Sequence, residues 1–304
     1  MKNKLSVIIS TYKHGAKLFS LLDYLNNLNL DEIVVIDDHS NRGGEIINKL
    51  KSLNIKSRLI VTKKPYGPWA TKSIGIKVAK NDYILHLDGD CEPVDSDIIS
   101  NHLKWLKKGY IFVFGNILFK EKDILTNAFY VRYCLSSSKY FLEEPKEFDS
   151  QNIIAITGNN FSLNRKMLYT KDIPNLGLYG GDDLYFTTLN MRKTGKKAIF
   201  DPTIFVKHKH VLSLRKLINK YYTYAVGSGV NRRFFGKLGD YYTEPLMKIY
   251  FSRIPIALNK FGLYPALLFF ILYPLYTVVT IPGFIRGFTL KINKIKIDYK
   301  EIKV

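Results

Sequence analysis

The chain has 304 residues, of which 46% are hydrophobic and 14% aromatic, and its formal net charge is +20. This length allows one sizeable core with an appendage and argues against two equal domains. The charge is extreme for a cytosolic enzyme and indicates an anionic partner or surface, such as nucleic acid, acidic lipid or a phosphorylated substrate.

Short apolar runs alternate with helical periodicity in the first part of the chain. Strands are expected at residues 5–10, 33–37, 58–62 and 83–88, and helices at residues 16–26, 44–53 and 70–80. Alternation of strands and helices predicts an α/β fold with a mostly parallel sheet. After about Phe205 this alternation fades, and basic and aromatic residues take over.

Polar side chains stand at the carboxyl ends of the first two strands. The first strand ends in Ser10, Thr11 and Tyr12, whose hydroxyls and ring could hold a base and a ribose, although a helix cap explains Ser10 or Thr11 alone equally well. The second strand ends in Asp37 and Asp38, which could accept hydrogen bonds from a base or a ribose. A single Asp there would be more typical of an Asx-turn.

Lys72 lies in the segment 67–75, where the third helix begins. A cation beside helix N-terminal amides could bind a diphosphate, whereas Lys72 taken alone is more typical of a solvated surface charge.

The fourth strand ends on two carboxylates, Asp88 and Asp90, on either side of Gly89. Residues i and i+2 of an extended strand share a face, so both carboxylates can converge on one ligand. Such oxygen donors suit Mg²⁺ or Mn²⁺ carrying a diphosphate. The motif alone is more typical of a turn, but several strand ends agree, and together they predict a nucleotide-sugar site.

A second acidic motif, Asp182 and Asp183, follows Gly180 and Gly181 where another helix is expected to begin. Acids at this position commonly complement the helix dipole. Direct displacement at an anomeric carbon needs a carboxylate that removes the acceptor's proton, and one such base without a second nucleophile gives inversion.

Taken together, the motifs resemble family 2 glycosyltransferases with the GT-A fold, a Rossmann-like sheet flanked by helices, of the type that builds bacterial or archaeal surface polysaccharides or glycolipids. The matching segments follow the family's order at residues 6–12, 35–40, 71–75, 88–90, 157–161 and 180–184. The resemblance implies metal-assisted transfer of a sugar from a nucleotide diphosphate, most often UDP, to an acceptor hydroxyl.

Site roles carry over by position. Thr11, Tyr12, Asp37 and Asp38 would contact the nucleoside, Asp90 would bind the metal directly, and Asp88 would lie nearer the ribose. Asp183 would be the catalytic base, Asp182 would orient the acceptor or a loop, and His208 is a candidate third metal ligand. The sequence departs from the family's pattern at two places. Asn41 stands where a further Asp is common, which concerns the nucleoside contacts beyond Ser40, and Lys72-Ser73 stands where Arg-Asn is common.

The segment 263–285 has no formal charge and is long enough to span a hydrocarbon core of roughly 30 Å. Basic residues flank it on both sides, which conflicts with a single crossing, and Pro265, Pro274 and Pro282 interrupt it. We therefore favour a re-entrant or interfacial helical hairpin over a span or a buried core helix. Residues 214–236 are expected to lie along an acidic headgroup surface.

The expected organisation is a catalytic domain at residues 1–210 and a membrane-associating region at residues 211–304. Two cysteines without metal-ligand spacing and an N-terminus without an apolar leader favour the cytoplasmic face of the cell membrane. The acceptor would be a glycan or lipid-linked hydroxyl.

Two other hypotheses are weaker. A sugar-1-phosphate nucleotidyltransferase would have a Gly-rich loop with Arg and Lys after the first strand. A non-enzymatic nucleic-acid-binding protein would not need carboxylates at successive strand ends, so no nucleic acid partner is expected.

Overall fold

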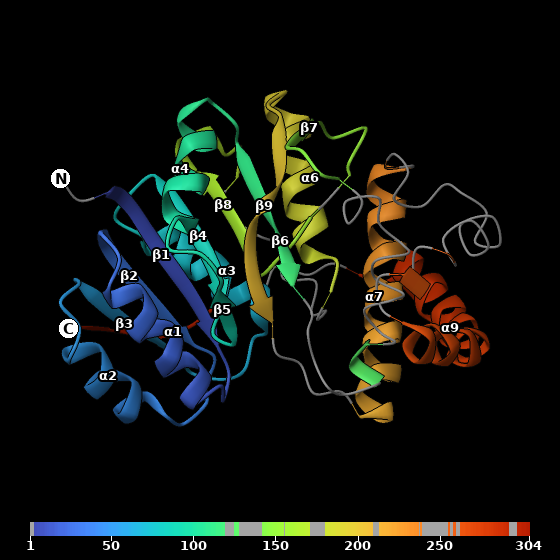
Figure 1. Ribbon diagram of the computed structural model, residues 1–304, viewed down its shortest axis with the longest axis horizontal. Coiled ribbons are helices and arrows are strands. Elements are labelled where there is room, and N and C mark those ends of the chain that lie inside the picture. The colour runs from blue at the N-terminus through green and yellow to red at the C-terminus, as the bar shows by residue number, and fades with distance from the viewer. Residues whose placement is uncertain are drawn as a thin grey trace.

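The computed structural model describes residues 3–118, 125–127, 142–154, 156–170, 180–208, 213–236, 238, 255, 258–259, 262–291 and 297–304. Its first part alternates strands and helices, as the periodicity predicts (Figure 1). The elements are β1 (Asn3–Thr11), α1 (Ala16–Asn26), β2 (Leu30–Asp37), α2 (Gly43–Lys51), β3 (Ser57–Thr62), α3 (Pro68–Val78) and β4 (Tyr83–Asp88). The four strands pair in parallel in the order β3-β2-β1-β4.

The rest of the sheet is mixed. Its elements are β5 (Cys91–Pro93), α4 (Ile98–Lys107), β6 (Phe112–Leu118), β7 (Lys146–Phe148), β8 (Asn160–Asn164), the 3₁₀ turn η2 (Arg165–Met167), α6 (Asp182–Thr194) and β9 (Ala198–His208). The strand order is β10-β3-β2-β1-β4-β8-β6-β9-β5, with β7 on β9. Strand β8 pairs antiparallel with both β4 and β6, whereas β6 and β9 pair in parallel, so the sheet is parallel through β3-β2-β1-β4 and mixed beyond.

The central strands are apolar throughout because helices cover both faces of the sheet. Val7 and Ile9 of β1 pack with α1, α2 and α4, whereas Ile8 faces α3 and α6. Helix α3 approaches β1 so closely that a methyl group on Gly75 would lie 2.3 Å from the Ile8 side chain. The strand ends are therefore held between two helical layers.

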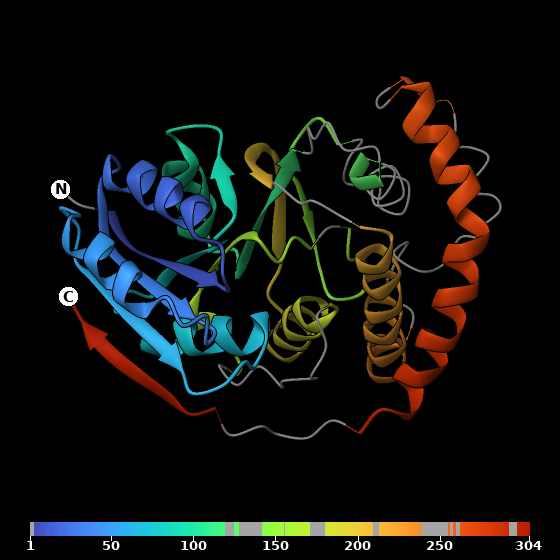
Figure 2. The same ribbon diagram turned by 90° about the horizontal axis from the view of Figure 1, so that it is seen from below.

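Two long helices, α7 (Leu214–Phe235) and α9 (Leu263–Thr289), pack side by side beyond the β6–β9 half of the sheet (Figures 1 and 2). Helix α9 runs unbroken through Pro274 and Pro282, so its segment is one helix and the expected hairpin is not formed. Apolar helices tolerate internal proline where neighbouring groups compensate. Here α9 is supported along its length by α7. Residues 266–289 are long and apolar enough to cross a membrane, and little of that stretch is buried.

Helix α7 is exposed at its two ends, at residues 214–216 and 233–234, so its expected place along a headgroup surface stays a prediction. Its Leu217 and Tyr221 are buried against α9, with the rings of Tyr221 and Tyr276 5.0 Å apart. The alternation of aromatic and basic residues in α7 reflects packing on two sides as well as exposure.

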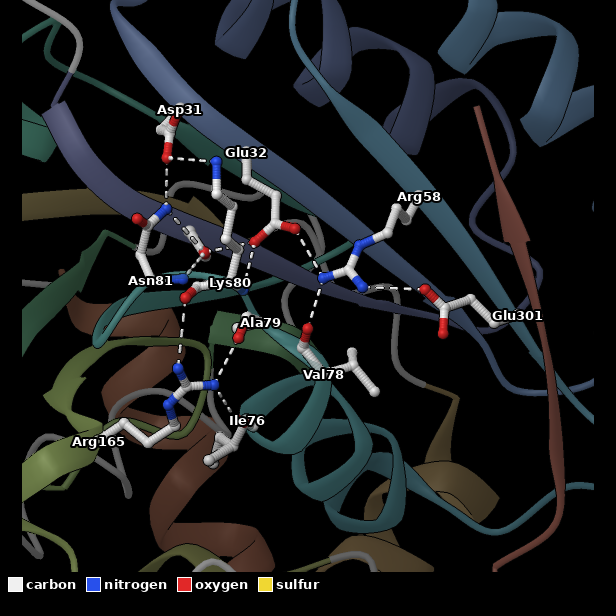
Figure 3. A network of polar contacts seen from close by, with 11 residues as sticks. Asp31, Glu32, Arg58, Ile76, Val78, Ala79, Lys80, Asn81, Arg165 and Glu301 are labelled. Atoms are coloured by element: carbon white, nitrogen blue, oxygen red, sulfur yellow. Dashed lines mark hydrogen bonds and ion pairs between the residues drawn. The ribbon is translucent and has the colours of Figure 1, made fainter.

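A last strand, β10 (Tyr299–Lys303), returns from α9 and pairs antiparallel with β3. Arg58 of β3 links it to the sheet through Glu301 at 2.9 Å and Glu32 at 2.6 Å (Figure 3). In the same network, Arg165 donates hydrogen bonds to carbonyls at the end of α3, including that of Ile76. Strand β10 is thus fastened to the N-terminal half of the fold.

Candidate active site

The predicted site residues of the first half meet at one edge of the sheet because their strands are parallel and in register. Ser10 lies opposite Asp88, and Thr11 lies opposite Asp37. Gly89 fits closely against this edge, since a methyl group there would lie 3.0 Å from the Thr11 hydroxyl oxygen.

Lys72 connects the two acidic motifs. Its Nζ lies 3.6 Å from Asp88 Oδ1 and donates a 2.5 Å hydrogen bond to the carbonyl of Gly158. A methyl group on Gly158 would lie 2.8 Å from Asp183 Oδ2 and 3.3 Å from Lys72 Nζ. Asp88 and Asp183, 95 residues apart in the sequence, therefore border the same small region around one buried cation.

Asp90 and His208 come together because β5 pairs antiparallel with the end of β9, with Cys91 opposite His208. His208 Nε2 lies 3.0 Å from Asp90 Oδ1. The ligand atoms of Asp90, Cys91 and His208 all lie within 4.8 Å of one another. Burial raises the pKa of the Cys91 thiol well above its usual range, so the donors available near neutral pH are a carboxylate and an imidazole. The carboxylate is the kind of donor that Mn²⁺ or Mg²⁺ prefers.

Turn residues at the start of α6 place Asp182 and Asp183. Gly181 has a φ of 90°, which favours glycine, and its carbonyl accepts a 2.9 Å hydrogen bond from Asn231 of α7. Asp182 is buried and Asp183 is half-buried. The half-buried Asp183 is thus the one of the two with access to a substrate.

The residues predicted to contact the nucleoside differ in their surroundings. Asp38 accepts hydrogen bonds from the backbone N–H groups of Tyr66 and Gly67, so its carboxylate holds the loop before α3. Asp37 is fully buried and accepts a 3.1 Å bond from the N–H of Ser40, and burial raises the pKa of its carboxyl. Both remain predictions as nucleoside contacts.

Ser10 and Tyr12 also differ in burial, since Ser10 is buried and Tyr12 is exposed. The Ser10 hydroxyl lies 3.1 Å from His86 Nε2 and 2.9 Å from the Thr71 hydroxyl. Burial, with the charge of Lys72, lowers the pKa of His86 well below its usual range, so this imidazole is neutral. Tyr12 is 46% exposed, which leaves its ring open to a ligand.

Sequence reasoning missed two residues of this region. Trp69 lies beneath Lys72, with the Lys72 Nζ 4.5 Å from the ring centroid. Lys220 of α7 is near enough to interact with Asp90 and Asp88; burial lowers its pKa to about 8, while these two carboxylates favour the charged form. No motif marks Lys220, because only the packing of α7 brings it there.

Comparison with known proteins gives consistent matches. A family model described as Glycosyl transferase family 2 matches residues 6–170. The chain is 34% identical over 162 residues to the poly(ribitol-phosphate) β-N-acetylglucosaminyltransferase TarP of Staphylococcus aureus, covering 45% of this chain and 48% of that protein. It is 25% identical over 197 residues to the GalNAc(5)-diNAcBac-PP-undecaprenol β-1,3-glucosyltransferase of Campylobacter jejuni, covering 63% of this chain and 61% of that protein. The matches thus span about half to three-fifths of these relatives.

A solved structure extends the likeness of fold to the C-terminal part. The mannosyltransferase PcManGT from Pyrobaculum calidifontis, in complex with GDP-Man and Mn²⁺, has a TM-score of 0.57 and 16% identity. The superposition covers 94% of this chain and 86% of that one.

Proposed function

The chain belongs to glycosyl transferase family 2 and has the GT-A fold, and from this premise we propose that it transfers a sugar from a nucleotide diphosphate to an acceptor hydroxyl. One observation carries the proposal. Asp88, Lys72 and Asp183 border a single region at the carboxyl edge of the sheet, with Lys72 Nζ 3.6 Å from Asp88 Oδ1. A base for the acceptor and charged groups for the diphosphate thus lie within one site.

In this proposal Asp183 removes the proton of the acceptor hydroxyl as that oxygen attacks the anomeric carbon. The reaction is a single displacement with inversion, since one base acts and no second nucleophile is needed. Lys72, held by the Gly158 carbonyl and the Trp69 ring, offers its positive charge to the departing diphosphate. Asp182, buried in the first turn of α6, orients the acceptor or a loop.

Asp90, Asp88 and His208 would hold a divalent cation, Mg²⁺ or Mn²⁺. Such an ion neutralises the diphosphate of a bound nucleotide-sugar. The presence of Mn²⁺ with GDP-Man in the similarly folded mannosyltransferase supports this proposal. We propose UDP as the nucleotide, by the resemblance of the motifs.

The proposed acceptor is a glycan or lipid-linked hydroxyl at the cytoplasmic face of the membrane. The names of the two relatives describe transfer to poly(ribitol-phosphate) and to an undecaprenol-linked glycan, which supports this class of acceptor. The apolar helix α9 and the net charge of +20 suit a location beside anionic lipid. Family membership leaves the nucleotidyltransferase and nucleic-acid hypotheses without comparable support.

Replacing Asp183 tests the assignment of the base. We expect Asp183→Asn to lower sugar transfer by about 10²–10⁴-fold, the usual contribution of a general base, while donor binding stays unchanged. The measurement is product formation with membrane extract as acceptor, beside the melting-temperature shift caused by UDP-, GDP- and dTDP-sugars. Asp97→Asn, which alters an exposed carboxylate outside the site, is the control. Undiminished transfer by the Asp183 variant would refute the assignment.

A further inference from the structure

One face of α9 is apolar, exposed and continuous. Its members recur at spacings of three, four or seven residues and are 41% to 72% exposed: Leu267, Ile271, Val278, Ile281, Ile285 and Phe288. We call these six residues the outer face. At a rise of 1.5 Å per residue they extend over about 30 Å. So long an apolar stripe on one side of a helix needs a partner.

The opposite face of α9 is already occupied by α7, and the two helices run in the same direction. Leu272 and Tyr276 pack against Leu217 and Tyr221 near the start of α7. Further along, a methyl group on Gly287 would lie 2.3 Å from the Val226 carbonyl oxygen. At the far end, Arg233 donates hydrogen bonds to the carbonyls of Phe288 and Leu290. Figure 2 shows α9 on the side of α7 that faces away from the sheet.

This packing is incompatible with α9 crossing a bilayer. Helix α7 would have to enter the hydrocarbon beside it, together with the exposed Arg215 and Lys216 of its first turn. The turn before Asp182 would follow, because a methyl group on Gly227 of α7 would lie 2.2 Å from the Gly180 carbonyl oxygen. Exposed charged side chains are costly in lipid hydrocarbon, and irregular backbone is tolerated there only where protein buries it or it lines a cavity.

The path of the chain after α9 also argues against a membrane crossing. Nine residues lie between Thr289 and Tyr299 of β10, a reach of about 35 Å at most. Strand β10 pairs with β3, at the far edge of the sheet from α9. The C-terminal flank of α9 thus returns to the same folded body as α7.

Charge identifies the partner as anionic lipid. The exposed Arg286 and Lys291 lie near the C-terminal end of the outer face, beside Arg233. Tyr264, 75% exposed, lies at the other end, and tyrosine favours the membrane–water boundary. A second copy of the chain, also with a net charge of +20, would bring like charges together, whereas anionic headgroups would be attracted.

We propose that α9 lies in the plane of an anionic membrane, with its outer face among the acyl chains of one monolayer and the catalytic domain on that same side. The inference rests on the proposed function only where it concerns a membrane-bound acceptor. Its test measures vesicle binding and involves no sugar transfer. It also fixes the site relative to the lipid, since α7 contacts both α9 and the turn before Asp182.

Vesicle flotation of the full-length protein tests the surface. We expect binding to phosphatidylcholine vesicles containing phosphatidylglycerol, and at least tenfold weaker binding to phosphatidylcholine alone. The double variant Val278→Glu, Ile281→Glu should lose at least tenfold in binding to the anionic vesicles. The control Tyr169→Glu, Val304→Glu changes two other exposed apolar side chains by the same charge and should bind within twofold of the unmodified chain. Equal binding by the two double variants would overturn the proposal.

Two further readouts separate lipid binding from its alternatives. With tags on both ends, protease added outside the vesicles should remove both, and protection of the tag after Val304 would show a crossing and contradict the in-plane placement. A lipid-free dimer that Val278→Glu, Ile281→Glu dissociates would instead assign the outer face to a second copy. The melting-temperature shift with nucleotide-sugars should be unchanged in both double variants, so a failed membrane test is distinct from a failed donor site.

Discussion

Lys72 is the residue that most clearly organises the site. Its side chain is buried, and a buried ammonium is costly unless charges and polar groups compensate. Asp88, the Gly158 carbonyl and the Trp69 ring provide that compensation. The arrangement keeps a positive charge in place before any substrate binds, which is the preorganisation that electrostatic catalysis requires.

Asp37 illustrates a conflict between stability and binding. Burial raises the pKa of its carboxyl, although the Ser40 N–H favours the charged form, so the ionised group destabilises the fold near neutral pH. Asp37→Asn keeps an oxygen acceptor for that N–H and removes the charge. We expect its melting temperature at pH 7.5 to be at least that of the unmodified chain, and its donor affinity to be at least tenfold lower.

The stability cost of the Asp37 carboxylate depends on pH. Because the pKa of Asp37 is raised in the folded state, protonation of this carboxyl favours the fold. The free-energy cost of burying the ionised carboxyl is therefore relieved as the pH falls through that pKa. The difference in melting temperature between Asp37→Asn and the unmodified chain should therefore shrink from pH 7.5 towards pH 4. A variant that melts well below the unmodified chain at pH 7.5 would contradict this account.

Some of these residues could be predicted from the sequence and others could not. Asp88 ends β4, and the carboxyl end of that strand determines where it lies. Asp90 lies in the turn between β4 and β5, so its place beside His208 depends on the pairing of β5 with β9. Lys220 and His86 carry no such signal, because their positions depend on helix packing and on a neighbouring strand. The hydrogen bonds by which Asp38 holds the loop before α3 could not be predicted either, since their backbone donors lie 28 and 29 residues away in the sequence.

Among the elements, α7 has the most consequential position, since glycines bring it close to partners on two sides. Gly227 faces the Gly180 carbonyl, and Gly229 faces the Phe284 carbonyl of α9. Neither position has room for a methyl group without movement of backbone. The helix therefore couples the turn that carries Asp182 and Asp183 to the helix that we place at the membrane.

Gly227→Ala tests this coupling. We expect α7 to shift away from the turn, lowering stability by about 1–3 kcal/mol and sugar transfer by at least tenfold, with donor binding little changed. Ser228→Ala, at the next position of the same helix, should leave transfer within twofold. Thermal unfolding and initial rates of transfer provide the measurements. A Gly227→Ala variant as active as the unmodified chain would show that the catalytic turn does not depend on α7.

The elements beyond the first parallel strands were harder to predict. Pro274 and Pro282 favour helix ends, yet α9 continues through both because its packing along α7 compensates. Strand β10 is short, and three of its five residues are charged, namely Lys300, Glu301 and Lys303. It is therefore recognisable only through its pairing with β3. Local patterns carry little information about such long-range contacts.

At the scale of the molecule, the fold has the site at one edge of a sheet, with α9 and β10 at opposite ends of it (Figures 1 and 2). The carboxyl edge of the sheet holds Asp37 and Asp88, and Lys72 connects Asp88 to the region that Asp183 of the second half borders. The chain that carries this acidic site has a formal net charge of +20. Such a combination suits an enzyme whose substrates and surroundings are anionic while its cation is held by carboxylates.

The central claim is that these carboxylates hold a divalent cation and the diphosphate it neutralises, and the Mn²⁺ dependence of donor binding tests it most directly. At a donor concentration of 100 times Kd, binding should stabilise the fold by about 2.7 kcal/mol, and removal of Mn²⁺ should abolish most of the resulting rise in melting temperature. Asp90→Asn should lose the Mn²⁺-dependent part of that rise, whereas Asp23→Asn, an exposed carboxylate on α1, should keep it. An Asp90→Asn variant with an unchanged Mn²⁺-dependent rise would contradict the account.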